Sequence, residues 1–222
     1  MLATQLIGSP RGSRSRSDAL GTYLLERLKE RGVSINKVYF QQALSSEQCF
    51  DAVFRTIKEA DLIPLVYPLY ADDHHSGAVK AMELICGDPN NKHLSEKQMM
   101  VAISDADFPE SLHNDLSLAT SKRFAVGCGL RWARGPVLGG DWYIAGLTLE
   151  EAEGLVRNIR KPLKLADVDL AKGENAPADA GRLMAKPLMP EWVYLLVGHI
   201  GWLWKAGKQG CSKSLYDRPY LN

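Results

Sequence analysis

The chain has 222 residues, with 27 Lys and Arg against 26 Asp and Glu, so its formal net charge is +1 at pH 7. With 45% hydrophobic and 24% charged residues, the composition is that of a folded protein rather than of a disordered acidic or basic chain. The balanced charge argues against a nucleic-acid-binding protein, because such proteins usually present a strongly basic surface. The length is sufficient for one or two domains that fold without a structural metal or disulfide.

Apolar runs alternate with amphipathic segments along the chain, which predicts a parallel sheet covered by helices on both faces. In chain order we expect a strand at 3–7, a helix at 18–31 capped by Ser17, a strand at 33–40, a helix around 50–57, a strand at 61–67, a helix at 77–85, a strand at 98–104, a helix at 110–126, a strand within 130–138 and a helix capped by Thr148. Residues 170–181 are rich in Ala, Gly and Pro and indicate a linker. We therefore expect an α/β domain over 1–168, and a linker with a helical C-terminal extension over 169–222.

The four cysteines, Cys49, Cys86, Cys128 and Cys211, lie far apart in the sequence. None of their spacings is typical of a zinc or iron–sulfur site, so we interpret them as free thiols in a reducing compartment. The first residues lack the basic and apolar regions of a signal peptide. A cytoplasmic location is the expectation.

The segment between the first strand and the first helix concentrates positive charge. Arg11, Arg14 and Arg16 all precede the first acidic residue, Asp18, and four serines, Ser9, Ser13, Ser15 and Ser17, lie between or beside them. After a parallel strand, such a segment lies where the start of a helix offers unpaired amides and a partial positive charge. This predicts a phosphate-binding loop, although it matches neither the Walker nor the dinucleotide glycine pattern. A solvated turn without a ligand is the alternative.

Four short stretches carry a family likeness when they are taken in order. They are Gly8, Ser9, Pro10 and Arg11 with Ser17; residues 68–72 with Lys80; residues 108–110 with His113, Phe124, Ala125 and Trp132; and residues 186–190 with residues 218–220. The first three resemble the phosphate loop, the second flavin loop and the segment after the fourth strand of flavodoxin-like, NAD(P)H-dependent FMN reductases. The fourth is similar to the tail of one oxidoreductase subgroup of that superfamily.

This resemblance implies a flavodoxin-like three-layer sandwich with a five-stranded parallel sheet of order 2-1-3-4-5. It also implies an FMN site at the loops after the first, third and fourth strands. The implied cofactor-binding residues are Ser9, Arg11, Ser15, Arg16 and Ser17 for the phosphate, Pro68, Leu69, Tyr70, Ala71 and Asp72 along the isoalloxazine, and Ser104, Asp105, Asp107 and Phe108 at its pyrimidine edge. Tyr70 is the candidate for stacking on a ring face.

The implied activity is that of an FMN-dependent oxidoreductase, which takes hydride from NADPH or NADH and passes electrons to a small acceptor such as a quinone or free flavin. No catalytic side chain is expected, because the flavin carries the chemistry. Two alternatives stay open: an electron-transfer flavodoxin without its own NAD(P)H activity, and a flavodoxin-fold binding protein that has lost FMN. The near-neutral charge argues against the first, and the second is motivated by the acidic second loop and by Asp107, which stands where the subgroup usually has glycine.

Two clusters contain metal-ligand residue types without a complete ligand set. Residues 72–75 are Asp, Asp, His and His, but sequence neighbours seldom converge on one ion, so we expect a loop in solvent or beside the flavin. Glu110 and His113 have the spacing of a di-iron ligand pair without the second copy that such a site needs, which indicates a surface or capping pair. We expect no metal site.

Residues 192–204 form an apolar segment with three tryptophans, followed by Lys205 and Lys208. The segment is shorter than the roughly 20 residues that cross a bilayer. We expect it to pack against a domain or a partner subunit, and hence a homodimer. Contact with a membrane surface and a lid over the flavin site are the alternatives.

Overall fold

The computed structural model of the chain describes residues 1–87, 94–108, 110–133, 137–139, 157–186 and 190–217. The chain divides into two compact units, Met1–Leu188 and Met189–Asn222. The second unit contains α7 (Glu191–Lys208) and a short 3-10 helix, η7 (Ser212–Ser214). Among the described residues, no helix has the length and apolarity needed to cross a membrane.

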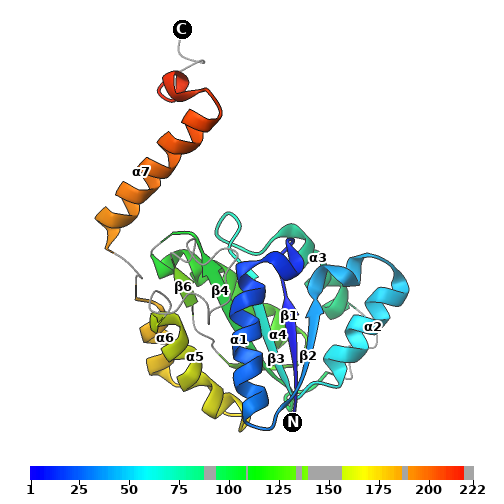
Figure 1. Cartoon of the computed structure of the whole chain (residues 1–222). Coiled ribbons are helices and arrows are strands. Elements are labelled where there is room, and N and C mark those ends of the chain that lie inside the picture. The colour runs from blue at the N-terminus through cyan, green and yellow to red at the C-terminus, as the bar shows by residue number, and fades with distance from the viewer. Residues whose placement is uncertain (88–93, 109, 134–136, 140–156, 187–189, 218–222) are drawn as a thin grey trace. The chain divides into compact units, whose positions relative to one another are not determined.

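The first unit is built on a parallel sheet (Figure 1). Its strands are β1 (Leu2–Ile7), β2 (Ser34–Tyr39), β3 (Leu62–Pro68), β4 (Met99–Ala106), β5 (Arg131–Ala133) and β6 (Val137–Gly139). The order is β2-β1-β3-β4-β5, and β6 pairs with β4. In register, Met99 of β4 faces Arg131 of β5, while Ser104 of β4 faces Val137 of β6. The predicted order 2-1-3-4-5 is therefore confirmed, with two short strands in the fifth position.

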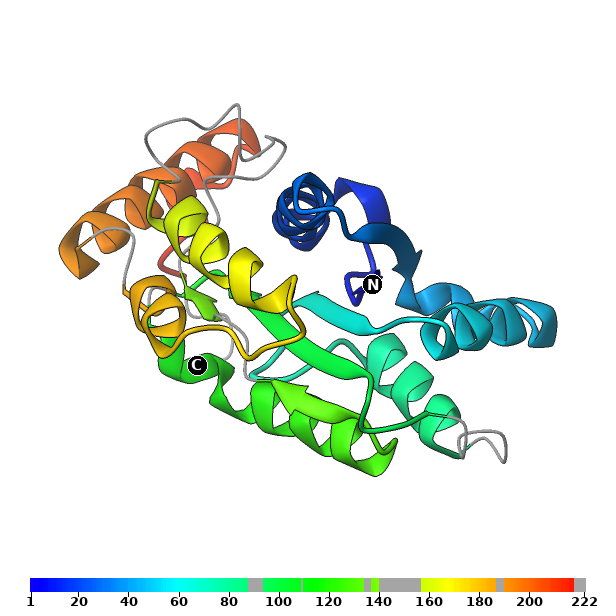
Figure 2. The same ribbon diagram turned by 90° about the horizontal axis from the view of Figure 1, so that it is seen from below.

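Helices cover both faces of this sheet. They are α1 (Arg16–Glu30), α2 (Glu47–Lys58), α3 (Ser76–Gly87), α4 (Asp115–Gly127), α5 (Arg157–Leu170) and α6 (Ala178–Met184), with short 3-10 helices η1 (Gly12–Arg14), η2 (Phe40–Leu44) and η4 (Ser111–Asn114). Figure 2 shows α1 and α5 on one face of the sheet and α3 and α4 on the other. Along β3, Leu62 and Val66 belong to the first of these cores, whereas Ile63 and Leu65 belong to the second. Burial on both faces explains the continuous apolar run of the central strands.

Three predicted features of the helices differ from the structure. The helix expected at 110–126 begins as the 3-10 helix η4, and α4 starts only at Asp115. The N-cap of α1 is Ser15, whose hydroxyl accepts a hydrogen bond from the Asp18 amide at 3.1 Å, and not Ser17. The helix begins two residues earlier than expected, which places Ser17 inside its first turn. Residues 178–181, expected in a linker, begin α6, which packs against α5. The helix predicted to start at Thr148 cannot be compared over residues 148–156, which lie outside the described residues.

A disulfide joins Cys86, near the end of α3, to Cys128, which follows α4. Their Cα atoms lie 5.2 Å apart, because the two helices end side by side on the same face of the sheet. The prediction of four free thiols is wrong for this pair and holds for Cys49 and Cys211.

A buried carboxyl group fastens α5 to α1. Asp167 has a fully buried side chain and accepts hydrogen bonds from Nε of Arg27 at 2.9 Å and from Nε of Arg31 at 2.6 Å. The hydrogen bond that Arg27 donates to Asp167 is the main reason why the pKa of Arg27 is raised. This contact holds α1 in place, and the first turn of α1 faces the candidate site.

Candidate functional site

Three loops meet at the carboxyl edge of the sheet, which is its upper end in Figure 1. We name them the first loop (residues 8–16, after β1 and including the first residue of α1), the second loop (69–75, after β3) and the third loop (residues 107, 108 and 110, after β4). The Gly8 amide donates to the Val66 carbonyl at 2.8 Å, and the Leu69 amide donates to the Asp105 carbonyl at 2.8 Å. The first loop is thus joined to β3, and the second loop to β4, by backbone contacts between residues 58 and 36 positions apart in the sequence, as the flavodoxin likeness predicts.

Gly8 is positioned by close packing. A Cβ atom at this residue would lie 2.8 Å from the Cβ atom of Tyr67 in β3. Only a residue without a side chain lets the first loop leave the sheet so close to the neighbouring strand.

The hydroxyl groups of Ser9, Ser15 and Ser17 are engaged within the protein. Ser9 accepts from the Arg11 amide at 3.3 Å, and Ser15 donates to the Gly12 carbonyl at 2.7 Å. The buried Ser17 donates to Oδ2 of the buried Asp105 at 2.5 Å. These three predicted phosphate ligands therefore shape the loop and tie it to β4. The side chains that the loop exposes are those of Arg11, Ser13 and Arg14.

Arg16 and Asp107 form an ion pair across the first and third loops. The Arg16 side chain is only 16% exposed, whereas that of Asp107 is 63% exposed. Asp107 stands where the resembled subgroup usually has glycine. It therefore binds Arg16, which the resemblance assigned to the FMN phosphate. With the bond from Ser17 to Asp105, this pair connects the start of α1 to the end of β4 twice.

The second loop turns sharply after Tyr70. Tyr70 and Asp73 exchange backbone hydrogen bonds of 2.7 and 3.0 Å around Ala71 and Asp72, whose φ angles are +47° and +68°. Two successive left-handed residues are typical of a type I′ turn, which usually contains Gly or Asn. The turn leaves Ala71, Asp72 and Tyr70 exposed, and the ring of Tyr70 contacts that of His75 edge-on with centroids 5.2 Å apart.

His74 lies behind this turn and is buried, whereas the sequence predicted that residues 72–75 form a loop in solvent or beside the flavin. Its ring lies on that of Tyr67 with centroids 3.7 Å apart, and its Nε2 lies 2.9 Å from the Ser121 hydroxyl and 3.1 Å from the Ser117 carbonyl. Burial lowers the pKa of His74 to about 4, so the ring is neutral at pH 7. Asp73 binds the Thr120 hydroxyl at 2.9 Å. The turn is thereby fastened to α4.

Side chains from the second and third loops meet at His113. Its Nδ1 lies 3.6 Å from Oδ1 of Asp72, and its ring centroid lies 5.1 Å from that of Phe108, which is 52% exposed. Ser104 is buried and donates to Oδ1 of Asn114 at 2.6 Å. The structure thus brings Phe108 and Asp72 together at His113, while Ser104 and Asp105 are buried.

Pro68 and Leu69, the remaining predicted residues, are half-buried where β3 enters the second loop. The sequence missed Asn114, His74 and Ser117 as supports of the site. The sequence gives only a weak indication of them, namely that they are polar residues next to apolar segments. Recognising them requires knowing that α4 lies against the end of β3.

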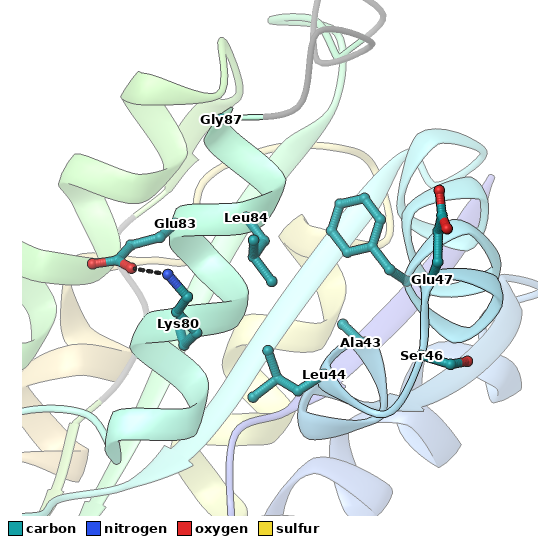
Figure 3. Close-up of a pocket in the computed structure, with 9 residues that line it drawn as sticks. Ala43, Leu44, Ser46, Glu47, Lys80, Glu83, Leu84 and Gly87 are labelled. Atoms are coloured by element: carbon teal, nitrogen blue, oxygen red, sulfur yellow. Dashed lines mark hydrogen bonds and ion pairs between the residues drawn. The ribbon is translucent and has the colours of Figure 1, made fainter.

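A hollow of about 750 Å³ lies elsewhere, between η2 and α2 on one side and α3 on the other (Figure 3). Leu44 and Leu84 line it with Phe50, and the Lys80 and Glu83 ion pair lies at its side. It shares no lining residue with the three loops. We therefore do not assign it to the site.

The described residues fit a flavin mononucleotide in chemical character. Exposed Arg11 and Arg14 stand at the start of α1, where helix amides and positive charge favour a phosphate. Exposed aromatic rings, those of Tyr70 and Phe108, project from the second and third loops. The charge of Arg16 is already partly balanced by Asp107, so the first loop is less cationic than its sequence suggests.

The comparisons with known proteins agree with this architecture. The sequence matches no family profile and no curated protein. Among solved structures, an FMN-dependent NADH-azoreductase from Bacillus anthracis in complex with FMN is 16% identical, with a TM-score of 0.56 over 77% of this chain and 100% of that one. A flavone reductase is 14% identical with a TM-score of 0.59 over 83% and 70%, and an NADH:FMN oxidoreductase is 12% identical with a TM-score of 0.56 over 86% and 96%. The chain has the flavodoxin-like fold shared by these FMN and NAD(P)H oxidoreductases.

Proposed function

We propose that the protein is an FMN-dependent oxidoreductase that takes a hydride from NADPH or NADH and passes the electrons to a small acceptor such as a quinone or free flavin. The observation that carries the proposal is the meeting of three loops at the carboxyl edge of the sheet, with exposed arginines at the start of α1. Solved structures of the same fold include an NADH-azoreductase, an NAD(P)H:quinone oxidoreductase and an NADH:FMN oxidoreductase. These names support the proposed class of reaction.

Each loop has a separate task in this proposal. Arg11 and Arg14 would attract the phosphate, together with the first amides of α1. Tyr70, presented by its rigid turn, would cover a face of the isoalloxazine. Bound FMN would supply the hydride acceptor, while the protein supplies position and electrostatic tuning. Neutral His74 would hold the second loop in place without adding charge beneath it.

The test is reconstitution of the purified chain with FMN, followed by anaerobic addition of NADPH or NADH. Bleaching of the bound flavin band is expected with at least one nucleotide, and comparison of the two rates gives the preferred donor. Binding without bleaching would indicate the electron-transfer flavodoxin. No binding of FMN would favour a flavodoxin-fold binding protein, an alternative that gains support from the pairing of Arg16 with Asp107.

A pair of arginine variants tests the location of the site. Arg11→Gln removes an exposed charge from the first loop, and we expect it to weaken FMN binding by roughly ten-fold, the loss of one charge-assisted hydrogen bond. Arg123→Gln removes another exposed arginine, which lies in α4, and should leave binding unchanged. Titration of flavin fluorescence measures both dissociation constants. Equal effects of the two variants would place the phosphate elsewhere.

A homodimer and a cytoplasmic location stay predictions from the sequence. Sedimentation equilibrium of the reconstituted protein measures the first. Fractionation of cells that express the chain measures the second. Neither outcome alters the proposed chemistry.

A further inference from the structure

The second unit exposes an unusual amount of apolar surface along α7. Trp192, Trp202 and Trp204 are 68%, 69% and 61% exposed, and Leu195 and Ile200 are 59% and 56% exposed. Isolated exposed apolar residues are common, but a continuous apolar surface of this kind marks a site of interaction. Within the described part of this unit, Ala206 alone is buried in the helix.

The apolar residues of α7 form one broad face. At about 100° per residue, they span about 220° of the helix circumference, from Trp202 at one border to Trp204 and Val197 at the other. His199 and Gly207 are the exceptions inside this face. The remaining arc holds Glu191, Tyr194, Gly198, Gly201, Lys205 and Lys208. The helix is therefore amphipathic, with tryptophans near both borders between its apolar and polar faces.

Lysines of the polar face lie over these border tryptophans. The Lys205 ammonium is 5.9 Å from the centroid of the Trp202 ring, and the Lys208 ammonium is 3.8 Å from that of Trp204. Residues 190–217 contain these two lysines and Lys213 against Glu191 and Asp217, so they carry a net charge of +1 with His199 counted as neutral, and all three lysines follow Trp204. A partner that covers α7 must therefore accept both apolar side chains and cations.

We propose that α7 binds the surface of a lipid bilayer that contains anionic phospholipids, and that it lies parallel to the membrane plane. The apolar face would enter the boundary between headgroups and acyl chains, the border tryptophans would lie at headgroup level, and the lysines would contact lipid phosphates. A seam between two helices buries a stripe of about 100°, which would leave about half of the apolar face in water. The charge and the width of the face thus favour a bilayer over a second copy of the chain. This inference does not depend on the proposed function.

The test is co-sedimentation of the full chain with vesicles of phosphatidylcholine alone or of phosphatidylcholine with phosphatidylserine, at low and high salt. We expect binding to the anionic vesicles that weakens at high salt. Lys205→Gln with Lys208→Gln should weaken it by roughly 30-fold, since each lysine near an anionic surface contributes about five-fold. Trp202→Ala with Trp204→Ala should weaken binding to both kinds of vesicle.

The matched control is Lys161→Gln with Lys164→Gln, which removes the same charge from an exposed face of α5. It should bind vesicles like the unmodified chain, and thermal melting should show that all variants are folded. The inference is overturned by equal binding to neutral and anionic vesicles, by an equal loss in the control, or by no binding at all. If light scattering shows a dimer that the tryptophan variant dissociates, α7 binds a second copy of the chain instead. If the tryptophans of a lipid-free monomer are shielded from acrylamide, α7 packs against the first unit instead.

Discussion

Protonation of the buried His74 should make the stability of the protein depend on pH. Burial lowers the pKa of this imidazole from 6.5 to about 4, against a smaller raising effect of Asp73. In the unfolded chain the same group titrates near its ordinary value of about 6.5. Between these two values the unfolded chain binds a proton that the folded chain does not. The stability contributed by neutral His74 is therefore complete above pH 6.5 and decreases as the pH falls toward 4.

The size of the effect follows from the two pKa values. Each unit of pH within this window changes the free energy of unfolding by about 1.4 kcal/mol. The loss is about 2 kcal/mol at pH 5 and about 3 kcal/mol near pH 4. Losses of this size are measurable, because domains of this kind are stable by only about 5–15 kcal/mol.

Urea unfolding at pH 7.5 and pH 5 measures the effect, with His74→Gln as the reference protein. Glutamine retains a polar group near Ser117 and Ser121 but does not titrate. The unmodified protein should lose about 2 kcal/mol more than the variant between the two pH values. Carboxyl groups and the other histidines titrate in both proteins, so their effects cancel in the difference. An equal loss in both would show that His74 is accessible to protons in the folded state.

Three further substitutions test the packing around the site. Gly8→Ala should lower the free energy of unfolding by about 1–3 kcal/mol and weaken FMN binding, because its Cβ would lie 2.8 Å from that of Tyr67; urea unfolding and flavin titration measure the two effects. Asp167→Ala should lower the free energy of unfolding by about 2–4 kcal/mol. The loss is smaller than for a fully buried ion pair, because Arg27 and Arg31 retain contact with water. An unchanged midpoint of urea unfolding would contradict the role of the contact. Cys86→Ser should lower stability by about 4 kcal/mol under oxidising conditions, given a sequence separation of 42, and should have little effect when unfolding is measured with a reductant.

The sheet was predictable because its residues obey simple rules. The runs at 61–67 and 98–104 are apolar since both faces of β3 and β4 are covered, and turn residues end most of the intervening helices. The fifth strand was located correctly, although it consists of β5 and β6. Local pattern is sufficient where burial, and not a specific partner, determines the structure.

The internal organisation of the site was not predictable in the same way. Ser15 and Ser17 are equally good caps by residue type, and they differ only because Ser17 faces Asp105, which is 88 residues away. The disulfide between Cys86 and Cys128 and the contacts of Asp167 likewise depend on which helix ends become neighbours. The sequence predicted only that His74 lies in a loop in solvent or beside the flavin, and the contacts that bury its ring come from serines of α4. Tertiary contacts between distant residues made these choices.

The ion pair between Arg16 and Asp107 changes what an anion would gain at the start of α1. When an anionic ligand binds Arg16, the arginine exchanges the carboxylate of Asp107 for the ligand. The ligand's gain in binding free energy is therefore the difference between these two attractions. A dianionic phosphate monoester can displace a carboxylate that bears a single charge, whereas a monoanion offers little advantage over it. The carboxylate of Asp107 would thus favour the binding of dianionic over monoanionic ligands at Arg16.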